Sequence, residues 1–383
     1  MGDARAALAA RTGNRTTVRV HWFLPTGGDS RDVLPDATGR APDLAYLAQV
    51  AQACDRLGYD AMLTPCGTGC EDAWLATAAL IPLTRHIRFL VAFRPALLTP
   101  TLAAQMASTY QRLSGGRLLV NIVTGAEPTE LARFGVHDDK ATRYEQTGEF
   151  IEVMRGAWSG KPFDFAGDHY AVEGATTREV PDPVPEIWFG GASDAAERIA
   201  ARHVDVYLAW GEPPTLVAER VARMRTLAAE AGRSLRFGIR FHVIARPTSD
   251  EAWAFADRLL AGMDPDAIAA AQRAFASTQS VGQQRMAALH GGVTDRLVVH
   301  PNVWAGIGLV RGGVGTALVG SYDEVADRMV EYQELGFEEF ILSGYPHLEE
   351  AYWFGEGVMP RLRARGLLPE VDTGGSGAVF SFR

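Results

Sequence analysis

Short apolar segments alternate with amphipathic segments along most of the chain. The apolar runs, such as Asp60–Thr64 and Ile87–Phe93, are short enough and sufficiently rich in large aliphatic and aromatic residues to be buried strands. The pattern predicts eight strands: Thr17–Leu24, Asp60–Thr64, Ile87–Phe93, Arg117–Val123, Glu186–Phe189, Val204–Ala209, Leu235–Ala245 and Glu339–Ser343.

The segments between these strands have apolar residues at helical spacing. They predict the helices Asp43–Leu57, Cys70–Leu80, Thr101–Leu113, Arg143–Trp158, Asp194–Arg202, Leu216–Ala231 and Tyr322–Leu335. Because βαβ crossovers make consecutive strands parallel, the alternation predicts an α/β fold, a single (β/α)8 TIM barrel. An open doubly wound sheet is the alternative, but no GxGxxG motif follows the first strand.

Two insertions interrupt the repeat, at about 125–185 and 250–302. The first contains a predicted hairpin in Phe163–Gly174, FDFAGDHYAVEG. The second precedes the last αβ unit and is interpreted as a long mobile lid, with a decorative or oligomer-forming insertion as the alternative. We therefore expect an N-terminal extension over 1–17, the barrel over 18–365 and a flexible Gly/Ser-rich tail over 366–383.

Composition narrows the class of protein. The net charge is -9, from 37 basic and 46 acidic residues without basic blocks, which disfavours nucleic-acid and anionic-membrane partners. No long apolar run or secretory signal is evident, so we expect a cytoplasmic protein. Cys54, Cys66 and Cys70 are odd in number and lack a second Cys or Cys/His pair, which argues against disulfides and structural zinc. Cys54 is expected in the core, and no metal site is predicted.

Side chains able to bind an anion follow several predicted strands. Strand alternation places Arg240 and His242 on one face, and an arginine that faces a barrel interior is costly unless an anion meets it. The predicted pocket combines cationic, imidazole, phenol and aromatic groups: His21, Phe23, Trp210, Arg240, His242, Arg311, Tyr345 and His347. Such a set suits an oxyanion with an apolar tail.

A second anion site is predicted at Gly190–Ser193. This stretch follows a strand and opens a helix at Asp194, so free backbone N–H groups and the Ser193 hydroxyl would face a phosphate. The chain has no GxSxG motif and no lysine at a strand end for a Schiff base. A redox reaction would therefore need a cofactor.

Nine longer stretches carry a family resemblance: Trp22–Thr26, Cys70–Leu75, Asn121–Gly125, Phe189–Gly191, Asp205–Pro214, Arg236–Ile244, Ser280–His290, Trp304–Gly313 and Ser343–Tyr352. They read WFLPT, CEDAWL, NIVTG, FGG, DVYLAWGEPP, RFGIRFHVI, SVGQQRMAALH, WAGIGLVRGG and SGYPHLEEAY. From about Val18 to Leu362 the chain resembles the reduced-flavin-dependent alkanesulfonate monooxygenases of the bacterial-luciferase-like superfamily.

The resemblance implies a reaction and its partners. It implies a homotetrameric TIM barrel that receives FMNH2 from a separate NAD(P)H-dependent FMN reductase. With O2, such an enzyme converts a small alkanesulfonate into sulfite and an aldehyde, which serves sulfur acquisition.

The resemblance also implies roles for individual residues. The catalytic set is Arg240, His242, Arg311, Tyr345 and His347, and the substrate would be bound by Trp210, Arg240, His242, Arg311 and Tyr345. Tyr345 or His242 is the expected proton donor. The flavin-binding set is Phe23, Cys70, Asn121, Thr124, Tyr144, Gly190, Gly191, Ala192 and Ser193.

One departure from the family concerns the first strand end. The family usually reads PTHGDG there, whereas this chain reads PTGGDS over Pro25–Ser30, with Gly27 in place of the histidine. Three alternatives remain open: an FMNH2-dependent dialkylsulfone monooxygenase, a deazaflavin-dependent oxidoreductase of the same superfamily, and a non-catalytic flavin-binding barrel.

Overall fold

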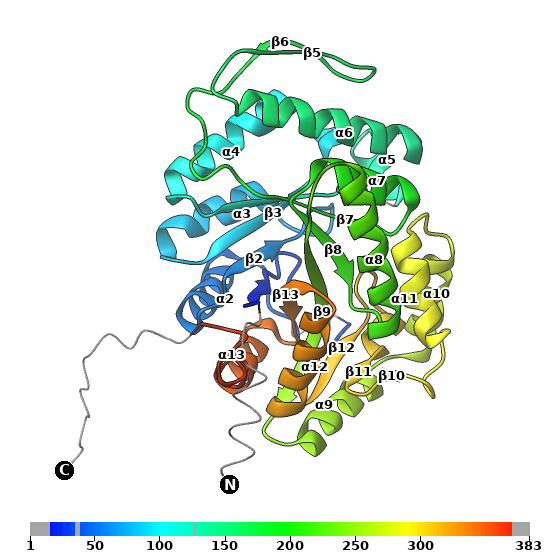
Figure 1. Cartoon of the computed structure of the whole chain (residues 1–383). Coiled ribbons are helices and arrows are strands. Elements are labelled where there is room, and N and C mark those ends of the chain that lie inside the picture. The colour runs from blue at the N-terminus through cyan, green and yellow to red at the C-terminus, as the bar shows by residue number, and fades with distance from the viewer. Residues whose placement is uncertain (1–15, 35–38, 126, 370–383) are drawn as a thin grey trace, which may run out of the picture.

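Eight parallel strands close into a barrel at the centre of the molecule (Figure 1). The computed structural model describes residues 16–34, 39–125 and 127–369. The barrel strands, in the order in which they pair, are β1 (Arg19–Phe23), β2 (Ala61–Thr64), β3 (Arg88–Phe93), β4 (Leu118–Ile122), β7 (Ile187–Gly190), β8 (Val206–Trp210), β9 (Arg236–Arg246) and β13 (Phe337–Ser343). Pairing of β13 with β1 and of β8 with β9 closes the ring. The predicted TIM barrel and its eight strands are confirmed.

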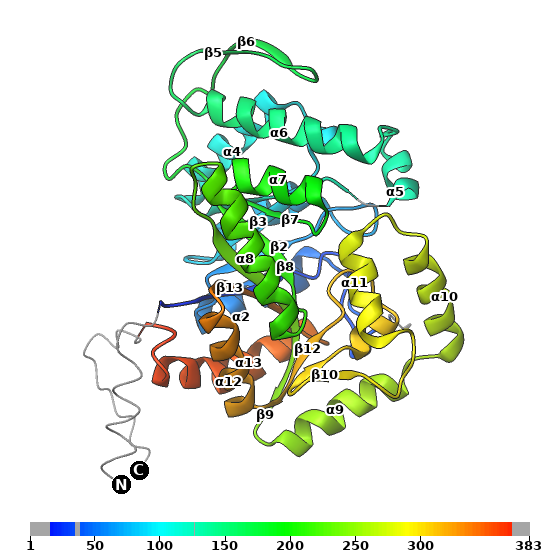
Figure 2. The ribbon, with the colours of Figure 1, turned by 45° about the vertical axis from the view of Figure 1, so that its right-hand side comes forward.

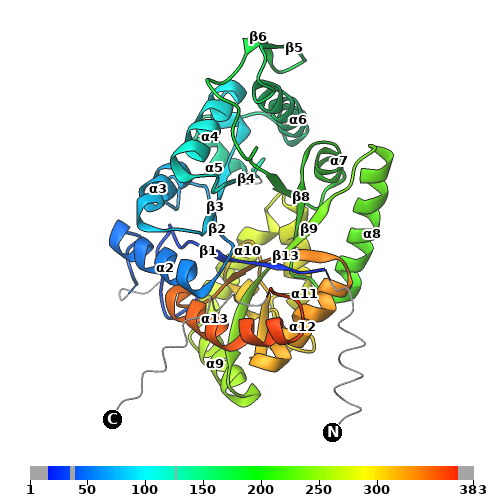
Figure 3. The same ribbon diagram turned by 60° about the vertical axis from the view of Figure 1, so that its left-hand side comes forward.

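Helices surround the barrel on the outside. They are α2 (Leu44–Leu57), α3 (Ala73–Leu80), α4 (Pro100–Ser114), α7 (Asp194–His203), α8 (Pro214–Glu230), α12 (Tyr322–Glu334) and α13 (His347–Ala364), with short 3-10 turns η1 (Ile81–Leu83) and η2 (Pro95–Leu97). In Figure 3, α2, α13 and α12 cover one side of the barrel, and their contacts agree with this view. Cys54 of α2 is buried between helix and sheet, as predicted.

Capping residues explain where several helices begin and end. The Asp43 carboxylate accepts a hydrogen bond from the Tyr46 N–H, and Gly58 adopts the left-handed conformation, φ 85°, that ends α2. The helix expected from Cys70 begins only at Ala73, because Asp72 caps it. Conversely, α6 (Lys140–Ala157) begins three residues before the predicted Arg143, because the Asp139 carboxylate accepts from the Thr142 N–H.

The first insertion builds a projection over the barrel. It holds α5 (Pro128–Arg133), α6 and the antiparallel pair β5 (Phe163–Ala166) and β6 (Ala171–Ala175), so the predicted hairpin is confirmed. The hairpin crosses the outer side of α6 at the top of Figure 1. The Glu149 carboxylate of α6 fixes its turn by accepting hydrogen bonds from the N–H groups of Asp168, His169 and Tyr170.

The second insertion contains three helices, α9 (Ser249–Ala261), α10 (Pro265–Ala276) and α11 (Val281–His290). Figure 2 shows α10 and α11 side by side at the edge of the barrel. The chain returns through β10 (Val298–His300), β11 (Val303–Trp304) and the turn η3 (Gly306–Leu309) to β12 (Ala317–Ser321). The sequence pattern did not predict β12. β12 forms because β9 extends past the barrel, so that residues 242–246 of β9 can pair with it.

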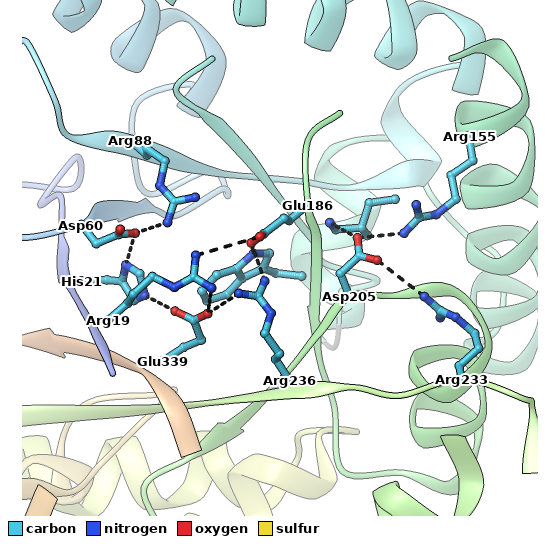
Figure 4. Close-up of polar contacts among 12 residues, drawn as sticks. Arg19, His21, Asp60, Arg88, Arg155, Glu186, Asp205, Arg233, Arg236 and Glu339 are labelled. Atoms are coloured by element: carbon cyan, nitrogen blue, oxygen red, sulfur yellow. Dashed lines mark hydrogen bonds and ion pairs between the residues drawn. The ribbon is translucent and has the colours of Figure 1, made fainter. Parts of the chain in front are cut away.

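The barrel interior is apolar in its middle and charged at its base. Phe23, Leu63, Leu90, Trp188 and Ile341 pack in the apolar part. At the amino ends of the strands lies a group that we call the basal charge network (Figure 4), which consists of Arg19, His21, Asp60, Arg88, Glu186, Arg236 and Glu339.

His21 belongs to this network and not to the predicted pocket. Its Nε2 lies 2.8 Å from Glu339 Oε2, and its Nδ1 lies 3.5 Å from Asp60 Oδ2. The prediction was wrong because strand alternation fixes the face of a residue but not its depth. His21 faces inward like Phe23, yet it lies one strand repeat, about 7 Å, closer to the base.

No helix in the described ranges is long and apolar enough to cross a membrane. The Val18 N–H donates to the Leu367 carbonyl at 2.8 Å, which ties the start of the first strand to the end of α13.

Candidate active site

A cavity of about 330 Å³ opens at the carboxyl ends of the barrel strands. Part of its wall comes from strand residues: Phe23, Leu63, Ala92, Asn121, Gly190, Leu208, Trp210, Arg240 and Ile341. Further wall residues come from the loops that follow β2, β4, β7 and β8, from α6 and α8, and from the second insertion. This is the end of a TIM barrel at which loops from all strands meet, so it is the expected place for a site.

Two arginines lie over the ring of Phe23. The guanidinium carbon Cζ lies 4.5 Å from the ring centroid for Arg240 and 6.0 Å for Arg311. Arg240 Nε and Nη2 are buried and have no hydrogen-bond partner among the described residues. Burial lowers the pKa of Arg240, and the positive charge of Arg311 lowers it further. Because arginine still stays cationic at neutral pH, the pair is poised to bind an anion.

Tyr345 joins two imidazoles to this pair. Its ring stacks on His242 at 5.4 Å between centroids and meets His347 edge-on at 5.5 Å. The His347 ring lies 5.6 Å from the Phe23 ring, so these residues form one cluster around Phe23. Burial and then the charges of Arg311, Arg240 and His347 hold the pKa of His242 well below its usual value. His242 is therefore neutral, and its Nδ1 lies 2.9 Å from Ser343 Oγ.

The start of α7 supplies a second anion-binding element. Ser193 is the N-cap of this helix, and its hydroxyl accepts from the Ala196 N–H. A Cβ added to Gly191 would lie 2.5 Å from the Cβ of Ala196, so only glycine permits this close approach of loop and helix. Gly190, Gly191, Ala192 and Ser193 all line the cavity, with backbone N–H groups free at the helix terminus.

Comparison with known proteins shows the family. The sequence profile described as "Luciferase-like monooxygenase" matches residues 18–339. The chain belongs to this family.

Solved structures of low sequence identity share the fold of this luciferase-like monooxygenase. The EDTA monooxygenase from Chelativorans sp. BNC1 has a TM-score of 0.75 at 22% identity, covering 93% of this chain and 95% of that one. DmoA from Hyphomicrobium sulfonivorans has a TM-score of 0.78 at 20% identity, covering 93% and 90%. A riboflavin lyase solved with modified FMN and riboflavin has a TM-score of 0.74 at 21% identity, covering 92% and 93%.

Most of the predicted site residues of this luciferase-like barrel meet at one end. Phe23, Asn121, Thr124, Tyr144, Trp210 and Arg240 line the cavity together with Gly190–Ser193. His242, Arg311, Tyr345 and His347 do not line it directly, but adjoin it through their contacts with Phe23 and with one another.

Like His21, Cys70 is a predicted site residue that the structure places outside this group. Its Sγ faces the carbonyls of Pro65 at 3.7 Å and Gly67 at 3.5 Å, and Cys66 lines the cavity in its place. Burial raises the pKa of the Cys66 thiol to about 11, so this thiol is protonated at neutral pH. The loop Cys66–Cys70 turns back between the two cysteines, which one-dimensional spacing did not predict.

Two basic residues of the cavity wall were missed in the sequence analysis. Lys140 stands four residues before Tyr144 on α6, so both share one helix face, and both line the cavity. Arg220 also lines it, although its guanidinium pairs with Glu212 at 3.0 Å. The signal for Lys140 was available, because helical spacing from the predicted Tyr144 leads directly to it.

The second insertion closes one side of the cavity. A Cβ added to Gly282 would lie 3.1 Å from the Trp210 ring, so α11 starts directly on this tryptophan. Arg285 of α11 pairs with the buried Glu212 at 2.5 Å, and Lys140 Nζ donates to the Gln279 carbonyl at 2.9 Å. These contacts attach the second insertion to Glu212, just after β8, and to α6 of the first insertion.

Asp29, in the loop after β1, was also missed. It is 5% exposed and contacts His347 through both carboxylate oxygens. Its position just beyond a strand end was the available signal.

Proposed function

We propose that this chain is the oxygenase of a two-component system that uses FMNH2 and O2 to desulfonate alkanesulfonates. The products would be sulfite and an aldehyde, and the physiological role sulfur acquisition. The observation that carries the proposal is the pair Arg240 and Arg311 over Phe23, without a carboxylate partner for either among the described residues. A sulfonate supplies the missing anion and three acceptor oxygens.

The cavity fits the proposed cofactor beside the start of α7. The glycines at the start of α7 leave room for a phosphate beside free N–H groups, and Lys140 adds a cation in the same wall. Phe23, Leu63 and Ile341 provide an apolar surface suited to a flat aromatic ring system. When bound, reduced flavin would activate O2 and supply one oxygen atom to the substrate.

The remaining steps belong to residues of this chain. Arg240 and Arg311 would hold the sulfonate oxygens and offset negative charge that develops during the reaction, while Trp210 would contact the alkyl chain. The second insertion, seated on Trp210, would exclude water. Tyr345, His242 and His347, joined by ring contacts, are placed to hold or move a proton.

The proposal includes two partners. FMNH2 would come from a separate NAD(P)H-dependent FMN reductase, and the oxygenase would assemble as a homotetramer. Analytical ultracentrifugation tests the assembly, and mixing with an FMN reductase and NAD(P)H tests the supply of reduced flavin.

An anaerobic titration tests the activity itself. Photoreduced FMN is titrated into the protein with and without alkanesulfonates of increasing chain length, and O2 is then admitted before sulfite is assayed. We expect tight FMNH2 binding and sulfite release that requires FMNH2, O2 and a sulfonate. Tight FMNH2 binding without sulfite release would reject an alkanesulfonate as the substrate. Product formation from a dialkylsulfone would then identify a sulfone as the substrate instead.

A further inference from the structure

Asp29 is a buried carboxylate with no oxygen left for solvent. Oδ1 accepts from the Ser30 N–H at 2.9 Å and contacts His347 Nδ1 at 2.8 Å. Oδ2 accepts from the His347 backbone N–H at 2.7 Å and from the Tyr46 hydroxyl. Asp29 therefore binds both the start of α13 and the imidazole of its first residue.

The ionisation of Asp29 follows from these contacts. Burial raises its pKa, but hydrogen bonds from the His347 ring, the Tyr46 hydroxyl and the His347 N–H lower it more, so the pKa lies below its usual value. Burial and the neighbouring Asp29 charge raise the pKa of Tyr46, which stays protonated as a donor. The acceptor is thus a carboxylate, and His347 Nδ1 must carry the proton that it accepts.

A hydrogen bond at one ring nitrogen determines the other. In a neutral imidazole, a proton on Nδ1 leaves the lone pair on Nε2. His347 Nε2 is buried and has no hydrogen-bond partner in the part of the chain that the structure describes. The ring that carries it packs against Phe23 and Tyr345, both in the active-site cluster. The free nitrogen therefore belongs to a histidine that combines a carboxylate partner with contact to Phe23.

Surrounding contacts hold Asp29 in this position. Asp29 and Arg40 exchange backbone hydrogen bonds at 3.0 and 2.6 Å, and the Arg40 guanidinium donates to Glu349 Oε2 at 2.7 Å and to Tyr46 at 3.2 Å. The loop that carries Asp29 is thus attached to α2 and to α13. These attachments hold the carboxylate in its place beside the His347 ring.

We propose that Asp29 is a positioning residue that holds His347 as its Nδ1-protonated tautomer, with Nε2 as the proton acceptor of the active site. The Nε2 lone pair takes one proton, and the resulting imidazolium faces an Asp29 that remains a carboxylate. The inference rests on the proposed function only for the reaction that uses this proton. It assigns a role to His347 that differs from that of the neutral His242, whose Nδ1 meets a serine hydroxyl instead of a carboxylate.

The simpler role for Asp29 is to cap α13. Pro346 at the N-cap offers no side-chain hydrogen bond, and Asp29 supplies one to the His347 N–H. Capping alone would affect stability but not the tautomer of His347. The two roles are therefore separated by a measurement on the imidazole itself.

The test is nitrogen-15 NMR of the full chain labelled at histidine, at mildly alkaline pH. His347→Gln identifies the resonances. We expect Nδ1–H with unprotonated Nε2 in the wild type, and in Asp29→Asn a shift toward Nε2–H, because an asparagine amide can donate to Nδ1. Nε2–H as the main wild-type tautomer would overturn the proposal, and that result needs no variant. An unchanged tautomer in Asp29→Asn would also overturn it.

Two variants control for the capping role. Glu349→Gln loosens the same helix start without touching the imidazole, and Tyr46→Phe removes the other side-chain donor to Asp29. Both should keep the wild-type tautomer. In the sulfite assay, Asp29→Asn should lower kcat about 100-fold with little change in KM, the size of a general-base contribution. A wild type without sulfite release would reject the proposed function, whereas the NMR result would still decide the role of Asp29.

Discussion

Charged residues are arranged differently at the base of the barrel and at its mouth. In the basal charge network each arginine faces a carboxylate, and Glu339, which is fully buried, receives Arg19, Arg236 and His21 at 2.8 to 2.9 Å. At the mouth, Arg240 and Arg311 share an aromatic ring and have no carboxylate partner among the described residues. Removal of one partner from a buried ion pair destabilises the fold, whereas a buried charge without a partner costs stability until a ligand arrives.

Strand β9 carries both arrangements. Arg236 and Arg240 face inward from the same strand, separated by two strand repeats, and only the lower one meets Glu339 and Glu186. His21 and His347, which both contact carboxylates, differ in the same sense. Both nitrogens of His21 face carboxylates, while His347 leaves Nε2 free. The comparison teaches that residue type alone does not separate structural from functional charges.

Removal of an arginine at the mouth should have the largest effect. Arg311→Ala should lower sulfite release about 1000-fold while FMNH2 binding, measured by anaerobic titration, stays within about twofold, because the loss concerns charge on substrate and transition state. Arg273→Ala, an exposed arginine of the same insertion, is the control. Normal turnover by Arg311→Ala would contradict a functional role for the Arg311 charge at the mouth.

Removal of an arginine at the base should reverse this outcome. Arg236→Ala should lower the free energy of unfolding by about 3 kcal/mol, because it leaves buried Glu339 and Glu186 with fewer cations, while kcat of the folded protein changes little. Urea unfolding measures the first quantity and the sulfite assay the second. Arg240→Ala should lower kcat and leave the free energy of unfolding nearly unchanged. Equal losses of stability in both variants would contradict the distinction between paired charges at the base and unpaired charges at the mouth.

His203, at the end of α7 near the base, should make stability depend on pH. Burial and then the charges of Arg233, Arg202 and Arg155 lower its pKa to about 4, although Glu152 lies 3.7 Å away. The folded state thus binds fewer protons than the unfolded state between pH 6.5 and 4, so stability falls as pH falls through this window. In His203→Gln, the loss of unfolding free energy between pH 6.5 and 4 should be smaller by roughly 2 kcal/mol. His86→Gln, exposed, should not.

The smallest expected effect concerns the phosphate end of the cavity. Lys140→Ala should raise the Kd for reduced FMN about fivefold, and added salt should diminish the difference, because a partly exposed charge pair is worth about 1 kcal/mol. Lys161→Ala, the exposed other lysine of the chain, is the control. A Kd that does not change with Lys140→Ala would place the phosphate elsewhere.

The elements of the barrel could be predicted because each has a local cause. Apolar runs with turn residues between them marked the eight strands, and amphipathic stretches marked α2, α3, α4, α6, α7, α8 and α12 to within a few residues. The helix α13, which follows the last strand, was not predicted. The errors have a physical reason as well. β12 forms only because β9 extends past the barrel, and α6 begins early because Asp139 caps it.

The candidate site was predicted in part. Periodicity placed Arg240 and His242 on the inner face, but it could not tell the depth of His21 or the turn that moves Cys70 away from the cavity. Lys140 and Asp29 were missed although helical spacing from Tyr144 and a position beyond a strand end were available as signals; the partner of Asp29, however, depends on the fold. Asp29 meets His347 across 318 positions.

The sequence by itself determined the alternation of strands and helices, and hence a parallel barrel with anion-binding side chains beyond its strand ends. These properties depend on spacing along the chain and on the chemistry of single residues. Only the tertiary structure decided which charges are paired, because pairing depends on distances between strands. Among the described residues, it left Arg240 and Arg311 without carboxylates while surrounding Glu339 with cations, and that difference separates the mouth of the barrel from its base.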